Sequence, residues 1–304
     1  MLGVCLLGTG GTVPLPRRFP TSLLLRSGGS SLLVDCGEGA QVAMRRKGRP
    51  CKPVDFICLT HYHCDHVAGL PGLLLTMGNS GRADPVALVG PEGLGRVVGA
   101  LLSVAPALPF ELSFRELSGA VEELSLGGYR VRAFGLDHGV PCYGYAACVD
   151  RAGRFDPGRA GERGIPVGAR GRLQRGEAVA QDGGLFTPDI VMGPPRRGLK
   201  VVYATDTRPT ERLAAEARGC DLCVLEGMHG DPGRAGRAGE RGHMTMQEAC
   251  RVAKQAGAAE LWLTHFSPAV GDPAEYAEEL RGIFPGTVID EDGPSRELSF
   301  GKDR

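Results

Sequence analysis

The sequence has no excess of charge of either sign, since its 304 residues include 35 basic and 35 acidic side chains. Because domains that bind nucleic acid over a large surface are usually basic, the overall charge does not point to such a partner. No apolar run approaches the roughly 20 residues that a membrane span needs. The first residues, MLGVCLLGTGG, lack the basic start of a secretory signal peptide. These absences predict a globular protein in the cytoplasm, with no membrane segment.

A disulfide-like rhythm is also missing, because the ten cysteines are scattered along the chain. Scattered cysteines are typical of a reducing compartment. Cys220 and Cys223 have the C-x2-C spacing of a zinc knuckle, but no second pair lies nearby. The surrounding run, CDLCVLEG, is typical of a buried strand, and we interpret the pair as part of one.

Histidine is scarce, yet three of the seven histidines stand in the stretch THYHCDHVAGLPG, residues 60–72. In an extended segment His61 and His63 point to the same side, while Asp65 and His66 lie beyond the turn. A single histidine is most often a hydrogen-bonded core residue. Imidazole and carboxylate groups at this spacing after a strand instead predict a site for zinc or a related metal.

Four strand-like runs each end at a potential metal ligand. Residues 54–60, 126–137, 199–205 and 259–264 precede His61, His138, Asp206 and His265. In α/β proteins the open ends of strands are where loops converge and sites form. The pattern therefore predicts an α/β fold in which His138 and His265 complete two metal sites and Asp206 bridges them.

Helices are predicted between these runs, over residues 66–78 and 245–257. The second opens with Thr245 and Glu248 at capping-box spacing and stops at Gly257. It begins just after His243, which it would hold near its N-terminus. Its core face comprises four apolar residues: Ala249, Val252, Ala253 and Ala256.

One segment departs from the neutral average. Residues 151–175 contain seven arginines against Asp156 and Glu162, a local excess of five positive charges. This segment belongs to a Gly- and Pro-rich stretch, 151–198, which like 229–242 has the composition of a long loop or arm. A solvated surface excursion and a functional arm are both compatible with that composition.

Taken in order along the chain, five motifs resemble those of a known family: DCGEGAQVAMRR, LTHYHCDHVAGLPGLLLTMG, YATDTRP, HMT before a helix, and LTHFSPAV. They resemble ribonuclease Z, a branch of the metallo-β-lactamase superfamily, over roughly residues 3–300. The resemblance implies an α/β four-layer αββα sandwich formed by a single domain, 1–304, with an inserted flexible arm, 151–198. It also implies that Asp35 orients a ligand histidine rather than binding metal.

The resemblance further implies a zinc-dependent endoribonuclease that removes the 3′ trailer of precursor tRNA by hydroxide attack and leaves a 3′-OH. Two zinc ions per subunit are expected, although manganese or iron could occupy such ligands. One ion would be held by His61, His63 and His138, the other by Asp65, His66 and His265, with Asp206 between them. Asp65 would also orient the attacking water, and His243, oriented by Glu226, would donate a proton to the leaving oxygen.

The stretch GIPVGARGRLQRGEAV resembles the arm with which this family grips tRNA. It reads Pro166-Val-Gly-Ala where Pro-x-Gly-Pro is usual. Arg170, Arg172 and Arg175 are its candidate phosphate contacts. Family members usually act as homodimers, in which one subunit's arm holds the tRNA for the other's active site.

Two alternatives stay open from the residues alone. A phosphodiesterase for small or cyclic phosphates, or an arylsulfatase-like hydrolase, would use the same metal site. The second alternative is a non-catalytic RNA-binding protein with a structural zinc site, although a purely structural site would not need Asp65, Asp206 and His243.

Overall fold

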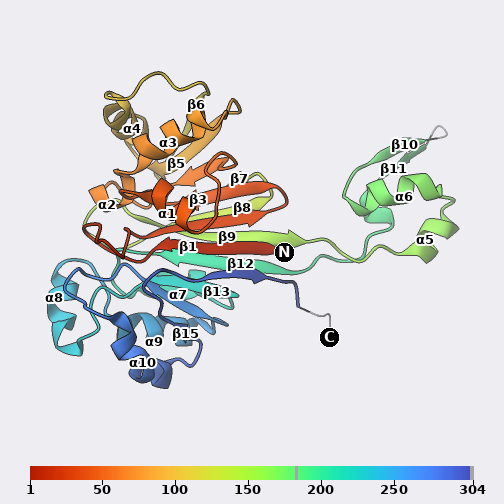
Figure 1. Cartoon of the computed structure of the whole chain (residues 1–304). Coiled ribbons are helices and arrows are strands. Elements are labelled where there is room, and N and C mark those ends of the chain that lie inside the picture. Colours follow the sequence, from red (N-terminus) through yellow and green to blue (C-terminus); the bar gives the residue numbers. More distant parts are fainter. Residues whose placement is uncertain (182–183, 302–304) are drawn as a thin grey trace. The chain divides into compact units, whose positions relative to one another are not determined.

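Strand-forming runs from both halves of the chain pair into two seven-stranded sheets (Figure 1). The computed structural model describes residues 1–181 and 184–301. Residues 182–183 of the predicted arm and 302–304 of the predicted single domain lie outside the described part. The described residues divide into two units: 1–148 with 200–299, and 149–199 with Phe300 and Gly301. The first unit contains both seven-stranded sheets except for the ends of two strands, residues 149–151 and 196–199, which belong to the second unit.

The first sheet combines an antiparallel edge with parallel strands. A two-residue turn at Gly28 and Gly29, with φ of 58° and 91°, joins the second and third strands, and such turns favour glycine. The strand order across the sheet is β16 (Ser295–Leu298), β1 (Leu2–Gly8), β2 (Ser22–Ser27), β3 (Ser30–Val34), β4 (Phe56–Cys58), β5 (Val86–Pro91) and β6 (Leu112–Leu117).

The second sheet has the same character, with parallel strands at one side and hairpin-connected strands at the other. Its order is β15 (Thr287–Val288), β14 (Leu261–Thr264), β13 (Leu222–Glu226), β12 (Arg196–Ala204), β9 (Tyr143–Arg151), β8 (Tyr129–Gly135) and β7 (Val121–Leu126). The four predicted strand runs are thus confirmed as β4, β8, β12 and β14.

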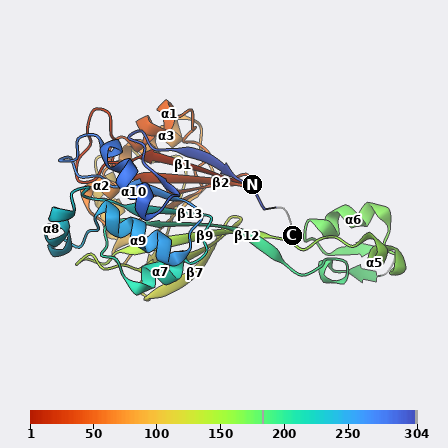
Figure 2. The same ribbon diagram turned by 90° about the horizontal axis from the view of Figure 1, so that it is seen from below.

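Helices cover the outer face of each sheet, which produces four layers (Figures 1 and 2). Alternate residues of the first sheet, such as Leu24 and Leu33, share a buried cluster with α1 (Ala40–Arg46), α3 (Leu70–Asn79) and α4 (Leu94–Leu102). A second cluster joins the other sheet to α7 (Glu211–Ala217), α9 (Met246–Ala256) and α10 (Ala277–Ile283).

Between the sheets the contacts include hydrogen bonds as well as apolar packing. Thr21 and Thr264 hydroxyls lie 2.6 Å apart, and the Tyr145 hydroxyl donates to the Leu59 carbonyl at 2.6 Å. These bonds link the first sheet and its loops to β14 and β9 of the second. The α/β sandwich predicted from the resemblance is confirmed.

The helix over 245–257 is also confirmed, but the one over 66–78 is interrupted. Thr245 and Glu248 form the predicted capping box of α9, and Gly257 ends it with φ of 61°. Residues 66–78 instead belong to two helices, α2 (Cys64–Val67) and α3. The break lies at Gly69, where a Cβ atom would stand 2.0 Å from the Gly37 carbonyl oxygen. The chain turns there because two backbone segments cross at close range.

The long loop expected over 229–242 contains helical turns, η2 (Pro232–Arg234) and α8 (Ala235–Glu240). Residues 151–198 also contain more regular structure than their composition suggested: α5 (Pro157–Glu162), α6 (Val167–Gln174), a hairpin of β10 (Val179–Gln181) and β11 (Gly184–Phe186), and η1 (Pro188–Ile190). These elements of the second unit surround a small core of buried residues: Ala160, Ile165, Ala169, Leu173, Val179 and Val191.

Among the described residues, no helix is both long enough and apolar enough to span a membrane. None of the ten cysteines, all of which lie in the described part of the chain, forms a disulfide bond. Cys223 lies in β13 and Cys220 just before it, both buried in the core, so the strand interpretation of this pair is confirmed.

Candidate metal centre

The carboxyl ends of β3, β4, β12 and β14 deliver Asp35, His61, Asp206 and His265 to one edge of the sandwich, where the loop after β8 brings His138. At this edge the side chains form two neighbouring groups, and the Asp206 carboxylate lies against both.

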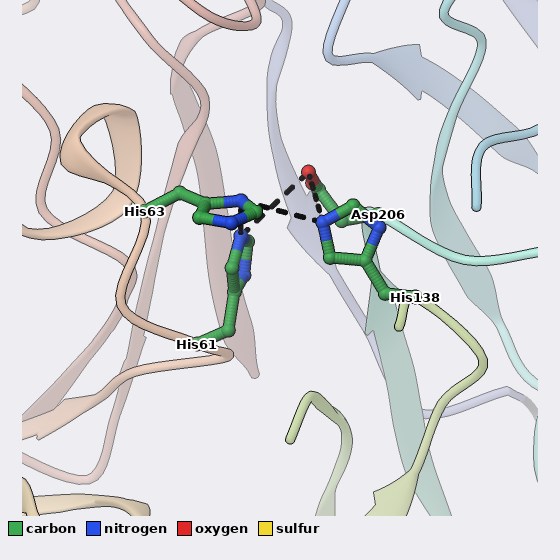
Figure 3. Close-up of side chains that lie close together, drawn as sticks. All are labelled: His61, His63, His138 and Asp206. Atoms are coloured by element: carbon green, nitrogen blue, oxygen red, sulfur yellow. Dashed lines mark hydrogen bonds and ion pairs between the residues drawn. The ribbon is translucent and has the colours of Figure 1, made fainter. Parts of the chain in front are cut away.

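The first group contains three imidazoles and one carboxylate (Figure 3). His61 Nε2 lies 2.9 Å from His63 Nδ1, and His138 Nε2 lies 3.3 Å from the same atom. Asp206 Oδ2 stands 3.7 Å from His61 Nε2 and 3.5 Å from His138 Nε2. His63 is exposed while the other three residues are buried, so the group is reached by solvent from one side. Four donor atoms thus converge on one small volume.

The second group uses the other oxygen of the same carboxylate. Asp206 Oδ1 lies 3.3 Å from His66 Nε2 and 3.2 Å from His265 Nε2. Asp65 Oδ2 stands 3.4 Å and 3.2 Å from the same two nitrogens. Because each Asp206 oxygen faces a different group, this carboxylate has the geometry of a bridge between two ions.

Backbone conformation at the centre is unusual. Among the described non-glycine residues, four have positive φ: Thr12 at 73°, Asp35 at 59°, Asp206 at 55° and His265 at 56°. Such conformations cost about 1–3 kcal/mol each and persist where the surrounding structure holds them. All four residues lie in or against the two groups, so the strain is concentrated where side chains must be aimed.

The donor set fits a divalent metal. His66 Nε2 and Asp206 Oδ1 are buried and have no hydrogen-bond partner among the described residues. Buried polar atoms are rarely left without a partner, because the free-energy cost of removing them from water is then not compensated by a hydrogen bond. Nitrogen and oxygen atoms of this kind, aimed at a common point, are the ligands that zinc and related ions take.

The pKa shifts of the side chains in the centre also indicate a site that attracts a cation. Burial lowers the pKa of His61 to about 2, which keeps this imidazole in the neutral form that binds metal. Burial also opposes the charged form of His265, but Asp206 and Asp65 outweigh it and raise its pKa to about 10. Burial would raise the pKa of Asp65, yet hydrogen bonds from His265 and His66 hold it well below its ordinary range. The carboxylates therefore stay ionised and attract a cation.

Asp35 makes a hydrogen bond to His66, one of the candidate metal ligands. Its Oδ2 lies 2.8 Å from His66 Nδ1, and its Oδ1 accepts the Thr60 N–H at 2.8 Å. The Tyr203 hydroxyl also donates to Asp35, at 3.1 Å. The hydrogen bond at Nδ1 fixes the ring so that His66 Nε2 faces the second group.

Glu226 and His243 stand beside the second group. Glu226 Oε2 lies 2.9 Å from His243 Nδ1 and 3.6 Å from His265 Nδ1. Glu226 is fully buried, whereas His243 is 9 % exposed. The Glu226 carboxylate therefore holds the imidazole of His243 at Nδ1. The partly exposed ring can contact a molecule bound at the solvent-facing edge of the centre. His243 also forms a third group with Asp206 and His265.

Two supports were not predicted from the sequence. The Arg208 guanidinium donates to the His243 carbonyl and, at 2.7 Å, to Glu248, the capping residue of α9. The Thr12 N–H donates to Asp65 Oδ2 at 2.6 Å. Both depend on loop conformations that join distant parts of the chain, and no sequence motif reveals them.

The Gly-rich turn after β1 lies beside the centre. A Cβ atom at Gly11 would lie 2.8 Å from the His265 ring, so glycine is required for the turn to pass it. His229 is half-buried, and its Nδ1 has no partner among the described residues. The structure places Arg170, Arg172 and Arg175 in the second unit, on and just after α6.

Comparison with known proteins identifies related chains. The family model described as Anti-Pycsar protein Apyc1 matches residues 2–98, and that of the beta-lactamase superfamily domain matches residues 190–266. Ribonuclease Z of Lachnospira eligens is 52 % identical over 300 residues, which cover 99 % of each chain. Ribonuclease Z of Lachnoclostridium phytofermentans is 49 % identical over 302 residues, again 99 % of each chain.

Among solved structures, human tRNase Z, short form, matches with a TM-score of 0.71 and 22 % identity, covering 98 % of this chain and 100 % of that one. At that identity the match supports the fold alone. The identity to the two bacterial relatives extends over nearly the full chain. By sequence and by its metallo-β-lactamase fold, the chain belongs to the ribonuclease Z family.

Proposed function

We propose that this chain is a zinc-dependent endoribonuclease that removes the 3′ trailer of precursor tRNA. The observation that carries the proposal is the double group of histidines and aspartates bridged by Asp206, beside the Glu226–His243 pair, in a chain of the ribonuclease Z family. Two ions per chain fit this arrangement, because each Asp206 oxygen faces a separate set of nitrogens.

In this proposal His61, His63 and His138 hold one ion and Asp65, His66 and His265 hold the other, with Asp206 as the shared ligand. When bound, zinc lowers the pKa of a coordinated water toward about 7 and stabilises negative charge that develops at phosphorus. The residues behind the ligands fix their direction, and Asp35 does so for His66.

Asp65 and His243 act on opposite sides of the scissile phosphate. Asp65, held by the Thr12 N–H, orients the attacking water and accepts its proton. The water oxygen forms a bond to phosphorus as the bond from phosphorus to the 3′-oxygen breaks. His243, held by Glu226, donates a proton to that leaving oxygen. The products are tRNA with a 3′-OH and a trailer with a 5′-phosphate.

Three further features belong to the proposal. Arg170, Arg172 and Arg175 of the second unit contact tRNA phosphates, which adds affinity without making the whole chain basic. The protein acts as a homodimer, in which the arm of one subunit serves the site of the other. It works in the cytoplasm, where cysteines without disulfide bonds are stable.

The test uses zinc-loaded protein, an end-labelled precursor tRNA and the Asp65→Ala variant. We expect a single cut directly after the discriminator nucleotide, which the variant does not make although it still binds the tRNA. Bis(4-nitrophenyl) phosphate is assayed in parallel. Hydrolysis of this small ester without any cut in the tRNA would contradict the proposal and indicate a small-molecule phosphodiesterase.

A further inference from the structure

A basic pocket adjoins His243 on the side formed by α8. Its volume is about 220 Å³, and its lining includes His243, His229, Thr12 and three arginines, Arg234, Arg237 and Arg241. No lining residue among the described ones is acidic. Neither the metal groups nor the proposed proton transfer requires the three arginines or His229, so these four residues have no role in the chemistry described above.

The three arginines share one side of a short element. They follow one another at intervals of three and four residues, the spacing that places side chains on one helical face. All three are exposed. Arg234 stands 3.9 Å from Asp231, whereas Arg237 and Arg241 make no ion pair with any residue in the described part of the chain. Two guanidinium groups beside His243 are therefore available to an anion.

His229, which also lines the pocket, is affected by the positive charge of the arginines. Its Nδ1 is buried without a hydrogen-bond partner among the described residues. Burial lowers the pKa of His229, and Arg234, His243 and Arg237 lower it further. A neutral imidazole with an unpartnered nitrogen can form a hydrogen bond to a polar group of a ligand. The arginines can at the same time neutralise the negative charge of that ligand.

The anion that suits this pocket is a phosphate of the RNA backbone. Planar guanidinium groups bind phosphate oxygens in pairs of parallel hydrogen bonds. His243 is the proposed donor to the leaving 3′-oxygen, so the nucleotide that carries this oxygen must lie on the His243 side of the scissile bond. That nucleotide is the last one of the tRNA, and the pocket opens on this side.

We propose that the pocket of Arg234, Arg237, Arg241 and His229 binds the last nucleotide of the tRNA through the phosphate on its 5′ side. This inference rests on the proposed function and specifies on which side of the scissile bond the tRNA part of the substrate lies. The arginines position the substrate by contact with a phosphate that does not react. They set which phosphodiester of the single-stranded 3′ end reaches the metal groups.

The first experiment replaces Arg237 and Arg241 together by alanine. We expect KM for precursor tRNA to rise about tenfold and the slope of log affinity against log salt to fall by about 0.7 for each phosphate that the variant no longer binds. The loss on bis(4-nitrophenyl) phosphate, which has no upstream phosphate, should be far smaller. The matched control is Arg251→Ala, because Arg251 is an exposed arginine of α9 that does not line the pocket.

The second experiment locates the contact. A methylphosphonate, which removes one charge, is placed either at the phosphate 5′ to the last tRNA nucleotide or at the first linkage within the trailer. The upstream change should impair the wild type and add nothing to the loss of the double variant. The trailer change should affect both proteins equally.

The pocket assignment would be wrong if the upstream methylphosphonate and the double substitution reduced affinity for precursor tRNA additively. It would also be wrong if an active double variant kept the wild-type slope of log affinity against log salt. A wild type that does not cut precursor tRNA would instead overturn the proposed function. In that case fluorescence anisotropy with trailer-free tRNA decides the pocket, because equal binding by wild type and double variant would contradict it.

Discussion

The candidate metal centre and the arginines of the second unit, which we propose to contact tRNA, hold their side chains in different ways. In the centre, His61, His66 and Asp206 are almost fully buried, and Asp35 and Thr60 make hydrogen bonds to the rings of His66 and His61. In the second unit, Arg172 and Arg175 are more than half exposed and share one carboxylate, Glu177, at 3.0 Å and 2.9 Å. Catalysis of bond cleavage requires side chains in a fixed geometry. Binding to a polyanion does not, because an exposed arginine can exchange one anionic partner for another.

The difference has a physical consequence for mutation. Each ligand in the centre contributes to a cooperative set, so that removal of one leaves buried atoms without partners. Each arginine of the second unit contributes a screened surface charge, worth little alone and more in number. Changes in the first region should therefore abolish function, and changes in the second should weaken binding by degrees.

The largest effect is expected for Asp206→Ala. Because Asp206 faces both groups, the variant should lose metal from both and lose cleavage of precursor tRNA altogether. Elemental analysis after gel filtration measures the metal. Asp137→Ala is the control, since Asp137 is an aspartate next to His138 that belongs to neither group. Retention of both metals in the Asp206 variant would contradict the bridging role.

His243→Ala should reduce kcat by about 10²–10⁴ while the metal content stays at the wild-type level, because in the proposed mechanism His243 donates a proton and does not hold an ion. Single-turnover rates with saturating precursor tRNA measure this step. Loss of metal in the variant would place His243 among the ligands, in the third group with Asp206 and His265.

Asp35→Asn should weaken zinc binding by about 10–100-fold, the usual cost of removing a partner behind a metal-bound histidine. Asparagine keeps the size of the side chain but presents a weaker acceptor to His66 Nδ1. Competition with a chelator of known affinity measures the change, and circular dichroism verifies the fold. Wild-type zinc affinity in a folded variant would rule out this positioning role.

The smallest effect is expected in the second unit. Replacement of Arg170, Arg172 and Arg175 by alanine should raise KM for precursor tRNA severalfold and lower its salt dependence by about 0.7 for each phosphate left unbound. Glu177→Gln should act in the opposite direction, because it releases Arg172 and Arg175 from their shared carboxylate. Equal losses on precursor tRNA and on a small phosphodiester in the triple variant would argue against tRNA binding by these arginines.

Much of the centre was predictable because strand runs are easy to recognise and each ends at a ligand. The alternation of β8 and the apolar runs of β4, β12 and β14 located His138, His61, Asp206 and His265 from the sequence alone. The pairing of Asp35 with a ligand histidine followed from the resemblance, and the structure identifies that histidine as His66.

Contacts made by loops were not predictable. Arg208 reaches the His243 carbonyl and Glu248, which are 35 and 40 residues away in sequence, and no periodic pattern encodes such a contact. Glycine-rich composition concealed the helical turns of α8, which are held by buried Ala238 and by the surrounding chain. The charge count over 151–175 omitted Glu177, which lies two residues beyond and pairs with two of the arginines.

The central claim is that two metal ions share the Asp206 carboxylate and that cleavage depends on both. The most direct measurement titrates metal-free protein with zinc while bound metal and cleavage of precursor tRNA are followed together. The account predicts saturation at two zinc ions per chain, with cleavage appearing as the sites fill. Saturation at a single ion, or cleavage by the metal-free protein, would contradict it.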